Sequence, residues 1–545
     1  MKLTKVLAGT LALMLTLTAC GPKLTDHVEM DIPYLTAPVT EDANRIELSD
    51  SGITLDGAAV GTDTTAAVYT ANDIVYYESG KDFTYGEGTE ADAHSPEEAA
   101  AHTVVHITQP GTYTLSGKLT KGQIAVDLGE DAKKNPDAVV TLVLEGVDIN
   151  CDVAPAVIFY NVYECGSDDA QSATKDVDTS AAGANVVIAD GTVNSVTGSY
   201  VARIYKPDSV VLSEDGTGVE DAKKLHKYDA AFYSKRTMNV FGGAENTGVL
   251  NIQAANEGLD SELHLTINGG NINIKSGNDG INTNEDGISV TTINGGNLNI
   301  QVTGETGEGD GIDSNGWLVI NGGTVIAQAC AFSADAGIDS DMGIHVNGGT
   351  VIATGSMLDR IEDGGQNYAV FNFAQRQNGG ETVTLKNQKN KAVLETTPQN
   401  AYSILIFSSP ELKAGTYTLW SGDAQLAGSA GGMMGGFGGG RGPGGGRGGR
   451  GQKPGDGQQP SEGDWSNEGF ERPEGDWSFE DFEWSEGGFE GFEPPEGNFE
   501  GFEPPEGFEP PQGGGRGDWG GSFNGEASTD FEIVDGGNNF SVTYA

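Results

Sequence analysis

Short segments in which apolar and polar residues alternate run through most of this chain, for example Asn271 to Ile274 and Thr324 to Ala327. Alternation with a period of two predicts β-strands with one buried face. Similar segments lie upstream, at Val104 to Leu115, Val139 to Ile149 and Val186 to Val193. In the repeated part of the chain they leave no room for helices of about 10 residues or more. We therefore expect an all-β protein.

Two phrases recur at a fixed period in the centre of the chain. The first is an Asn-Gly-Gly turn after Ile or Val, and its asparagines are 26, 27 and 26 residues apart, at Asn268, Asn294, Asn321 and Asn347. The second is Gly-Leu/Ile-Asp/Asn-Ser/Thr, which begins at Gly258, Gly280, Gly311 and Gly337. A fixed period in the twenties is typical of a solenoid.

A right-handed parallel β-helix is the fold that these repeats predict. Each coil would bend at Asn-Gly-Gly, because Gly, and less readily Asn, tolerates a positive φ angle. Ile, Leu and Val at corresponding positions would stack into one long core. The Leu-x-x-Leu-x-Leu spacing of leucine-rich repeats is absent from the sequence. The remaining alternative is a β-sandwich whose repeats are coincidental.

Residues 1–20 have the features of an export signal. Two lysines precede an apolar segment from Val6 to Thr18, which is too short to span a bilayer. The sequence Leu-Thr-Ala-Cys that ends at Cys20 resembles the bacterial lipobox, which implies cleavage before Cys20 and attachment of lipid to its sulfur. We expect a lipid-anchored protein on the extracellular face of the bacterial cell membrane, with a tether at residues 21–45. An ordinary signal peptide is the alternative.

The composition changes sharply near residue 430. Residues 431–527 are rich in Gly and Arg and then in acidic and aromatic residues with repeated Pro-Pro pairs. Gly and Pro at this density predict a disordered insertion. Strand-like residues return afterwards, so we expect a C-terminal β region made of residues 376–430 and 528–545. The β-helix itself would span residues 46–375.

The charge and the cysteine content limit the possible partners and cross-links. The 545 residues include 80 acidic and 30 basic side chains, a net charge of -50. This charge argues against nucleic acid and anionic lipid, so the membrane would be contacted through the anchor only. Cys151, Cys165 and Cys330 are too few for a disulfide scaffold. A Cys151–Cys165 bridge and two buried thiols both remain open.

Several motifs together resemble a bacterial carbohydrate-binding β-helix family. They are Gly-Thr-Tyr-Thr-Leu-Ser-Gly at 111–117, Gly-Gln-Ile-Ala-Val at 122–126, Leu-Val-Leu-Glu-Gly-Val-Asp-Ile at 142–149 and the two repeated phrases. The resemblance covers about residues 46–425. It implies binding of cellulose or pectin-type polymers on a fold similar to polysaccharide lyases with bound calcium. Residues 82–103 and 431–527 are additions that the resemblance does not explain.

Acidic residues fall into columns when the repeats are aligned on the Gly of the second phrase. Coils of a β-helix stack about 4.8 Å apart, so a Ca²⁺ between two coils would lie about 2.4 Å from oxygens on each. Asp and Asn oxygens are ligands that Ca²⁺ prefers. The alternative is a ladder of Asn and Asp turn residues that cap their own backbone. The predicted calcium ligands are Glu257, Asp260, Asp279, Asn282, Asp310, Asp313, Asp339 and Asp341.

Aromatic and basic residues near the acidic coils are candidates for contact with a polysaccharide, although each aromatic ring could equally pack in the core. A calcium ion with open positions could also bridge the protein to uronate carboxylates. The only basic residues expected near the acidic coils are Lys235, Arg236 and Lys275, which is poor provision for the base of a lyase. We therefore expect a cell-surface carbohydrate-binding protein and no enzyme, with a calcium-dependent polysaccharide lyase and a structural adhesin as alternatives. The predicted sugar contacts are Trp317, Tyr228, Tyr233, Lys235 and Arg236.

Overall fold

The computed structural model describes residues 43–431 and 527–543. The predicted signal peptide, Cys20, almost all of the tether and almost all of the predicted insertion lie outside these residues. The described part is nearly all β, which confirms the predicted class. Its helices are one short α-helix, α1 (Pro96–Ala100), and two 3₁₀ turns at Glu130–Lys134 and Pro207–Ser209. In these ranges no helix has the length and apolar character that crossing a membrane requires.

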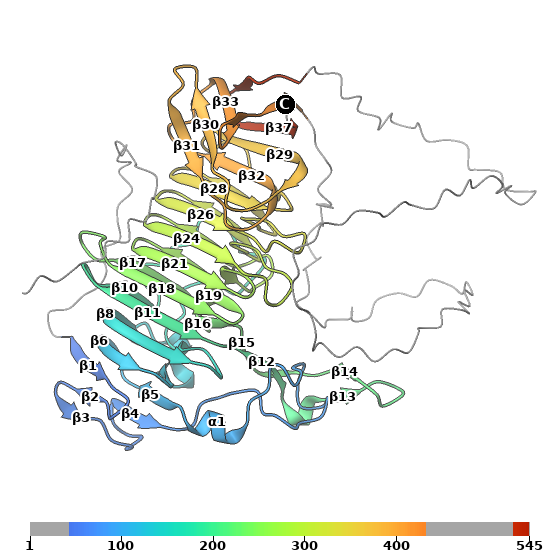
Figure 1. Cartoon of the computed structure of the whole chain (residues 1–545). Coiled ribbons are helices and arrows are strands. Elements are labelled where there is room, and N and C mark those ends of the chain that lie inside the picture. The colour runs from blue at the N-terminus through green and yellow to red at the C-terminus, as the bar shows by residue number, and fades with distance from the viewer. Residues whose placement is uncertain (1–42, 432–526, 544–545) are drawn as a thin grey trace, which may run out of the picture. The chain divides into compact units, whose positions relative to one another are not determined.

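Most strands belong to one 21-stranded sheet, in which strands of successive repeats pair in parallel. One series is β1 (Asn44–Leu48), β6 (Gly111–Leu119), β8 (Val140–Cys151), β10 (Ala184–Ile188), β17 (Met238–Gly242), β20 (His264–Ile267), β23 (Val290–Ile293), β25 (Trp317–Ile320) and β27 (Gly343–Val346). The second half of β8 starts another series, with β11 (Val193–Gly198), β18 (Val249–Ala254), β21 (Asn271–Ser276), β24 (Asn297–Val302), β26 (Thr324–Gln328) and β28 (Thr350–Gly355). Figure 1 shows the second series as a row of neighbouring arrows.

A second sheet of seven strands carries the Gly-Leu/Ile-Asp/Asn-Ser/Thr phrase. Its strands are β4 (Val68–Ala71), β5 (Thr103–Ile107), β7 (Gly122–Asp127), β9 (Val157–Asn161), β16 (Ala230–Ser234), β19 (Glu257–Ser261) and β22 (Ile281–Thr283). All pairs are parallel except β4 with β5. An isolated parallel bridge between Ile281 and Ile312 continues the sheet into the next repeat. The first two of the four repeats therefore contribute a strand to each of three stacks.

The predicted repeat period is confirmed by the register of the strands. Ile267 pairs with Ile293, Ile293 with Ile320, and Ile320 with Val346. These four side chains are at most 2% exposed, so equivalent apolar residues form one column of the core. The asparagines of the turns form a second column, in which each amide donates to the side-chain oxygen of the preceding one at 2.8–2.9 Å.

The second glycine of each Asn-Gly-Gly turn has the predicted positive φ angle, whereas the asparagine does not. At Gly296, for example, φ is +88° and an added Cβ would lie 2.7 Å from the carbonyl oxygen of Gly270. Any other residue would be strained there and would also collide with the turn above. The close stacking of the coils therefore depends on this glycine.

The parallel stack ends at β28, because the next strand that pairs with β28 is β32, and this pair is antiparallel. The last strand of the chain that the structure describes, β37, pairs with both β29 and β35. Phe371, Phe531 and Phe540 form an aromatic core between these strands. The strands of this region are β29 (Tyr368–Gln377), β30 (Val383–Asn387), β31 (Ala392–Thr396), β32 (Tyr402–Ser408), β33 (Gly415–Ser421), β34 (Ala424–Gln425), β35 (Ala427–Ala430), β36 (Phe531–Ile533) and β37 (Gly537–Thr543).

Three short antiparallel pairs of strands complete the described part. The hairpin strands are β2 (Thr54–Leu55) with β3 (Ala58–Ala59), β12 (Val201–Tyr205) with β15 (Lys224–Tyr228), and β13 (Val211–Leu212) with β14 (Val219–Asp221). Cys151, Cys165 and Cys330 are free thiols, so the Cys151–Cys165 bridge that the sequence allowed is not formed.

Candidate functional site

The acidic columns predicted from the repeats are brought into register by the second sheet. Asp260 pairs with Asn282 across β19 and β22. Gly258 donates to the carbonyl oxygen of Asp279, and Gly280 to that of Asp310, both at 3.0 Å. Polar side chains of successive repeats therefore lie directly above one another. Among the described residues they gather into two groups of three carboxylates.

The first group consists of Asp229, Glu257 and Asp260, each of which offers an oxygen within 4.8 Å of the others. Their side chains are 7%, 6% and 0% exposed. Asp229 was missed in the sequence because it precedes the four aligned repeats, directly before β16. The pairing of Ala230 with Glu257 places it beside the column.

Lys227 provides a positive charge beside this first group. Its Nζ lies 2.5 Å from Oδ2 of Asp229. Burial alone would lower the pKa of Lys227, but the charges of Asp229 and Glu257 outweigh burial and raise it. The expectation that Lys235, Arg236 and Lys275 are the only basic residues near the acidic coils was wrong, because β15 adds Lys227 as well as Lys224, whose Nζ lies 3.2 Å from Glu262.

One lysine does not balance three buried carboxylates. Burial, together with the charge of Asp229, raises the pKa of Glu257 to about 8. Burial and Glu257 raise the pKa of Asp260 well above its ordinary value. Glu257 Oε1 accepts a hydrogen bond of 3.2 Å from the Asn282 amide. Glu257 Oε2 and Asn282 Oδ1 are buried without a hydrogen-bond partner among the described residues. Such unsatisfied oxygens are expensive to bury, so the group has the donors and the charge for a cation.

The second group consists of Asp310, Asp313 and Asp339. Asp310 and Asp339 are 5% and 8% exposed, and Asp313 is half-buried. Burial, and then the charges of Asp339 and Asp279, raise the pKa of Asp310 well above its ordinary value. Oδ1 of Asp310 also accepts a hydrogen bond from the backbone N–H of Ala336 at 2.5 Å. This group therefore combines a possible cation site with a backbone cap.

The other predicted ligands lie outside the two groups of three carboxylates. Oδ1 of Asp279 accepts a hydrogen bond from the backbone N–H of Asp310 at 2.6 Å, which is the capping role that the alternative reading assigned to the columns. Asn282 lies next to the first group through its bond to Glu257. Asp341 is exposed at the surface.

The predicted sugar contacts are only partly accessible. Tyr228 and Tyr233 are 3% and 1% exposed, so the expectation that their rings face a polysaccharide was wrong. The two rings pack against each other with their centroids 5.3 Å apart, and the hydroxyl of Tyr233 donates a hydrogen bond to Glu262. Trp317 begins β25 and is half-buried, as are Lys235 and Arg236. Burial, and then the charge of Arg236, lower the pKa of Lys235.

Comparisons with known proteins agree with the carbohydrate-binding resemblance. The family model of carbohydrate-binding domain-containing proteins matches residues 101–393. A protein of that description from Acetivibrio thermocellus is 29% identical over 173 residues, which are 32% of this chain and 45% of the relative. The chain thus matches less than half the length of that relative. A solved structure, that of a polysaccharide lyase-like protein from C. thermocellum, is 22% identical and covers 57% of this chain and 90% of its own, with a TM-score of 0.32.

The matched family model spans more than half of the 545 residues. This chain therefore belongs to the family of carbohydrate-binding domain-containing proteins.

Proposed function

We propose that this protein binds plant-type polysaccharide, cellulose or pectin, at the bacterial cell surface, where lipid on Cys20 anchors it. Its parallel strand stack would be a right-handed β-helix stiffened by calcium between the coils. The observation that carries the calcium proposal is the pair of buried oxygens without partners, Glu257 Oε2 and Asn282 Oδ1, beside the carboxylate of Asp260.

Calcium fits these donors better than zinc. The carboxylates of the first group and the neighbouring amide of Asn282 offer only oxygens as ligands, and Ca²⁺ takes 6–8 oxygen ligands in flexible geometry. No His or Cys belongs to either group among the described residues, which argues against zinc. A bound divalent cation would allow the carboxylates to be ionised at neutral pH despite their burial.

The burial of the carboxylates favours a structural role for such ions. Glu257 and Asp260 are at most 6% exposed, which leaves little room for a polymer to reach a shared ion. We therefore propose that calcium holds the coils together and that the polysaccharide binds elsewhere.

The calcium proposal is tested by elemental analysis and by thermal melting with calcium and with EDTA. We expect stoichiometric calcium and a lower melting temperature in EDTA, since a ligand of the folded state stabilises it by about 2.7 kcal/mol at 100 times its Kd. Glu257→Gln should remove much of the EDTA effect. Asp341→Asn is the matched control, because it changes an exposed member of the same acidic columns. Absence of metal together with identical melting curves would contradict the proposal.

The binding proposal is tested with a soluble Cys20→Ser chain on cellulose, polygalacturonate and a glycan array. Absorbance of unsaturated products is followed in parallel. Binding without product supports a carbohydrate-binding protein, and product would instead show a lyase. Absence of both would favour an adhesin that acts through protein contacts.

A further inference from the structure

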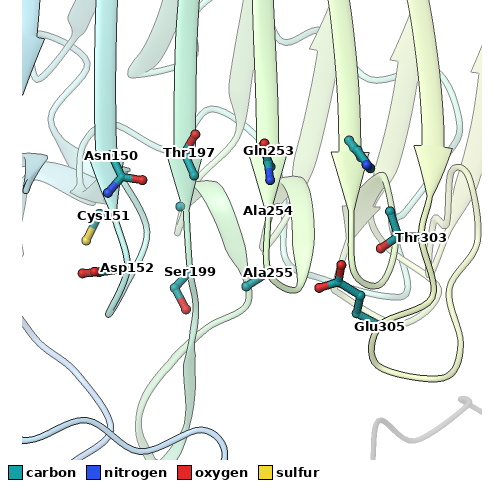
Figure 2. Close-up of a pocket in the computed structure, with 12 residues that line it drawn as sticks. Asn150, Cys151, Asp152, Thr197, Ser199, Gln253, Ala254, Ala255, Thr303 and Glu305 are labelled. Carbon is teal, nitrogen blue, oxygen red and sulfur yellow. The ribbon is translucent and has the colours of Figure 1, made fainter. Parts of the chain in front are cut away.

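A polar groove crosses the ends of neighbouring strands on the large sheet (Figure 2). Its volume is about 260 Å³, slightly below the roughly 300–1,000 Å³ typical of ligand sites. The ends of β8, β11 and β18 line it, followed by Lys275 of β21 and by Thr303 and Glu305 after β24. The groove therefore runs across the strands, from one repeat to the next.

The register of the strands places polar side chains of the groove in one row. Asn150 pairs with Thr197, Thr197 with Gln253, and Gln253 with Lys275. Residues paired in this way point to the same face of a sheet and are about 4.8 Å apart. The amide nitrogen of Asn150 donates to the carbonyl oxygen of Thr120 at 3.0 Å, so the row offers the Asn150 side-chain oxygen, a hydroxyl, a complete amide and an amine at regular intervals along the groove.

The accessible part of the row ends where the C-terminal β region covers it. Lys275 pairs with Gln301 and Gln301 with Gln328, which continue the same row. The amide of Gln301 donates to Asn400 at 3.1 Å, and Gln328 accepts from the backbone of Gln399 at 2.6 Å.

By contrast, Gln253 and Lys275 are exposed, and their side chains make no hydrogen bond or ion pair with the described residues. Their donors and acceptors are therefore available to a ligand.

An exposed aromatic ring adjoins the far end of the groove. Phe332 is 76% exposed, more than any other large apolar side chain in the described part of the chain. A Cβ built on Gly304 would lie 3.3 Å from Cδ2 of Phe332, and Gly304 stands between the lining residues Thr303 and Glu305. The apolar face of a sugar ring can stack on an exposed aromatic ring of this kind.

The charges in the groove favour a neutral glycan over one that carries carboxylates. Of its lining residues, Asp152 and Glu305 are negative and Lys275 alone is positive. A polymer with a carboxylate on every sugar would meet net repulsion in a chain that carries a charge of -50. Amide, hydroxyl and amine groups instead match the hydroxyls of a neutral sugar.

We propose that this groove is the polysaccharide site, that it takes an unbranched neutral glycan along the row from Asn150 to Lys275, and that Phe332 stacks on a sugar at its end. This inference rests on the proposed carbohydrate-binding function and assigns that function a place and a ligand class.

The test is calorimetric titration of the Cys20→Ser chain with cellohexaose and with an oligogalacturonate. Phe332→Ala and Gln253→Ala should each weaken cellohexaose binding about five- to tenfold. Val193→Ala is the control for the ring, because it removes another exposed apolar side chain, 63% exposed, at the opposite end of β11. Asn299→Ala is the control for the amide, because it lies on the same sheet outside the groove. All four positions are at the surface, and equal melting temperatures verify that the variants are folded.

The possible results distinguish an error in the groove assignment from an error in the proposed carbohydrate-binding function. Cellohexaose binding that falls in both groove variants and is unchanged in both controls supports the proposal. Cellohexaose binding that is equal in all chains overturns the groove assignment while leaving the proposed function standing. Binding of the oligogalacturonate alone overturns the neutral class. A chain that binds neither these sugars nor any glycan of an array overturns the proposed function and the groove with it.

Discussion

The buried side chain of His264 makes the free energy of unfolding depend on pH, and a single substitution can separate this contribution from the others. It is the first residue of β20 and is 2% exposed. Burial lowers its pKa from 6.5 to about 4. Its Nδ1 accepts a hydrogen bond of 3.1 Å from the backbone N–H of Val290 in the next repeat, and protonation of Nδ1 would break this bond.

The expected effect follows from the difference in proton binding between the folded and unfolded chain. Between pH 6.5 and pH 4 the unfolded state binds a proton at His264 and the folded state does not. The stabilisation from this residue is therefore present above pH 6.5 and is lost as the pH falls towards 4. At 1.36 kcal/mol per pKa unit the full effect is about 3 kcal/mol, of which about 2 kcal/mol falls between pH 7 and pH 5.

The measurement compares guanidinium unfolding of the natural chain and a His264→Asn variant at pH 7 and pH 5 with calcium present. Asparagine can still accept from Val290 but does not titrate. The buried acidic columns titrate equally in both chains, so their contribution cancels in the difference. We expect the stability difference between the two chains to change by about 2 kcal/mol over this range, with the natural chain losing more. An unchanged difference would refute the buried, neutral state of His264.

Three further predictions concern the stacking of the repeats. Gly323→Ala should lower the free energy of unfolding by over 1 kcal/mol more than Gly307→Ala does, as thermal melting of the two variants will show. Both glycines have a positive φ angle, but only a Cβ at residue 323 would collide with backbone, at 2.5 Å. Asn321→Ala should cost about 1 kcal/mol in chemical denaturation, since it removes the hydrogen bonds that Asn321 makes to Asn294 and Asn347 in the turn column. Cleavage of the chain between residues 432 and 526 should leave β37 bound, because it pairs with β29 and β35, and size exclusion followed by mass spectrometry detects the retained peptide.

The stacking of the repeats could be predicted because the same local signals recur. A glycine of positive φ and an inward Ile every 26 or 27 residues impose one register on successive strands. The partners of β37 could not be read in the same way. They depend on the pairing of β37 with β29, about 170 residues earlier in the chain, and no repeated phrase marks it. Contacts between segments so distant in sequence are set by which apolar faces remain uncovered, which the sequence of either segment alone does not reveal.

The candidate metal site was likewise predicted only in part from the sequence. The columns containing Glu257, Asp260 and Asp310 followed from aligning the repeats, because stacked coils place equivalent residues together. Asp229 and Lys227 could not be found in this way, since they belong to a segment outside the repeats. Tyr233 was a candidate sugar contact because aromatic residues gather there beside Lys235 and Arg236, but its ring is buried and packs against Tyr228 of β15. An inserted segment that packs onto a repeat thus changes both the charge and the exposure that the repeat alone predicts.

The acidic group belongs to the seven-stranded sheet and the groove to the large sheet, and this separates their expected responses to calcium. Gly258 of β19 packs on Ile274 of β21, since a Cβ on this glycine would lie 2.3 Å from the Ile274 side chain. Ile274 is buried, and the next residue, Lys275, faces the groove. Calcium beside Glu257 would therefore stabilise the coil without touching the sugar. EDTA should lower the melting temperature but change cellohexaose affinity by less than about twofold while the chain remains folded, because two sites are coupled only through a difference between states. If EDTA abolished binding at a temperature where circular dichroism shows an intact fold, calcium would have to act at the sugar itself, and the structural role assigned to the ion would be wrong.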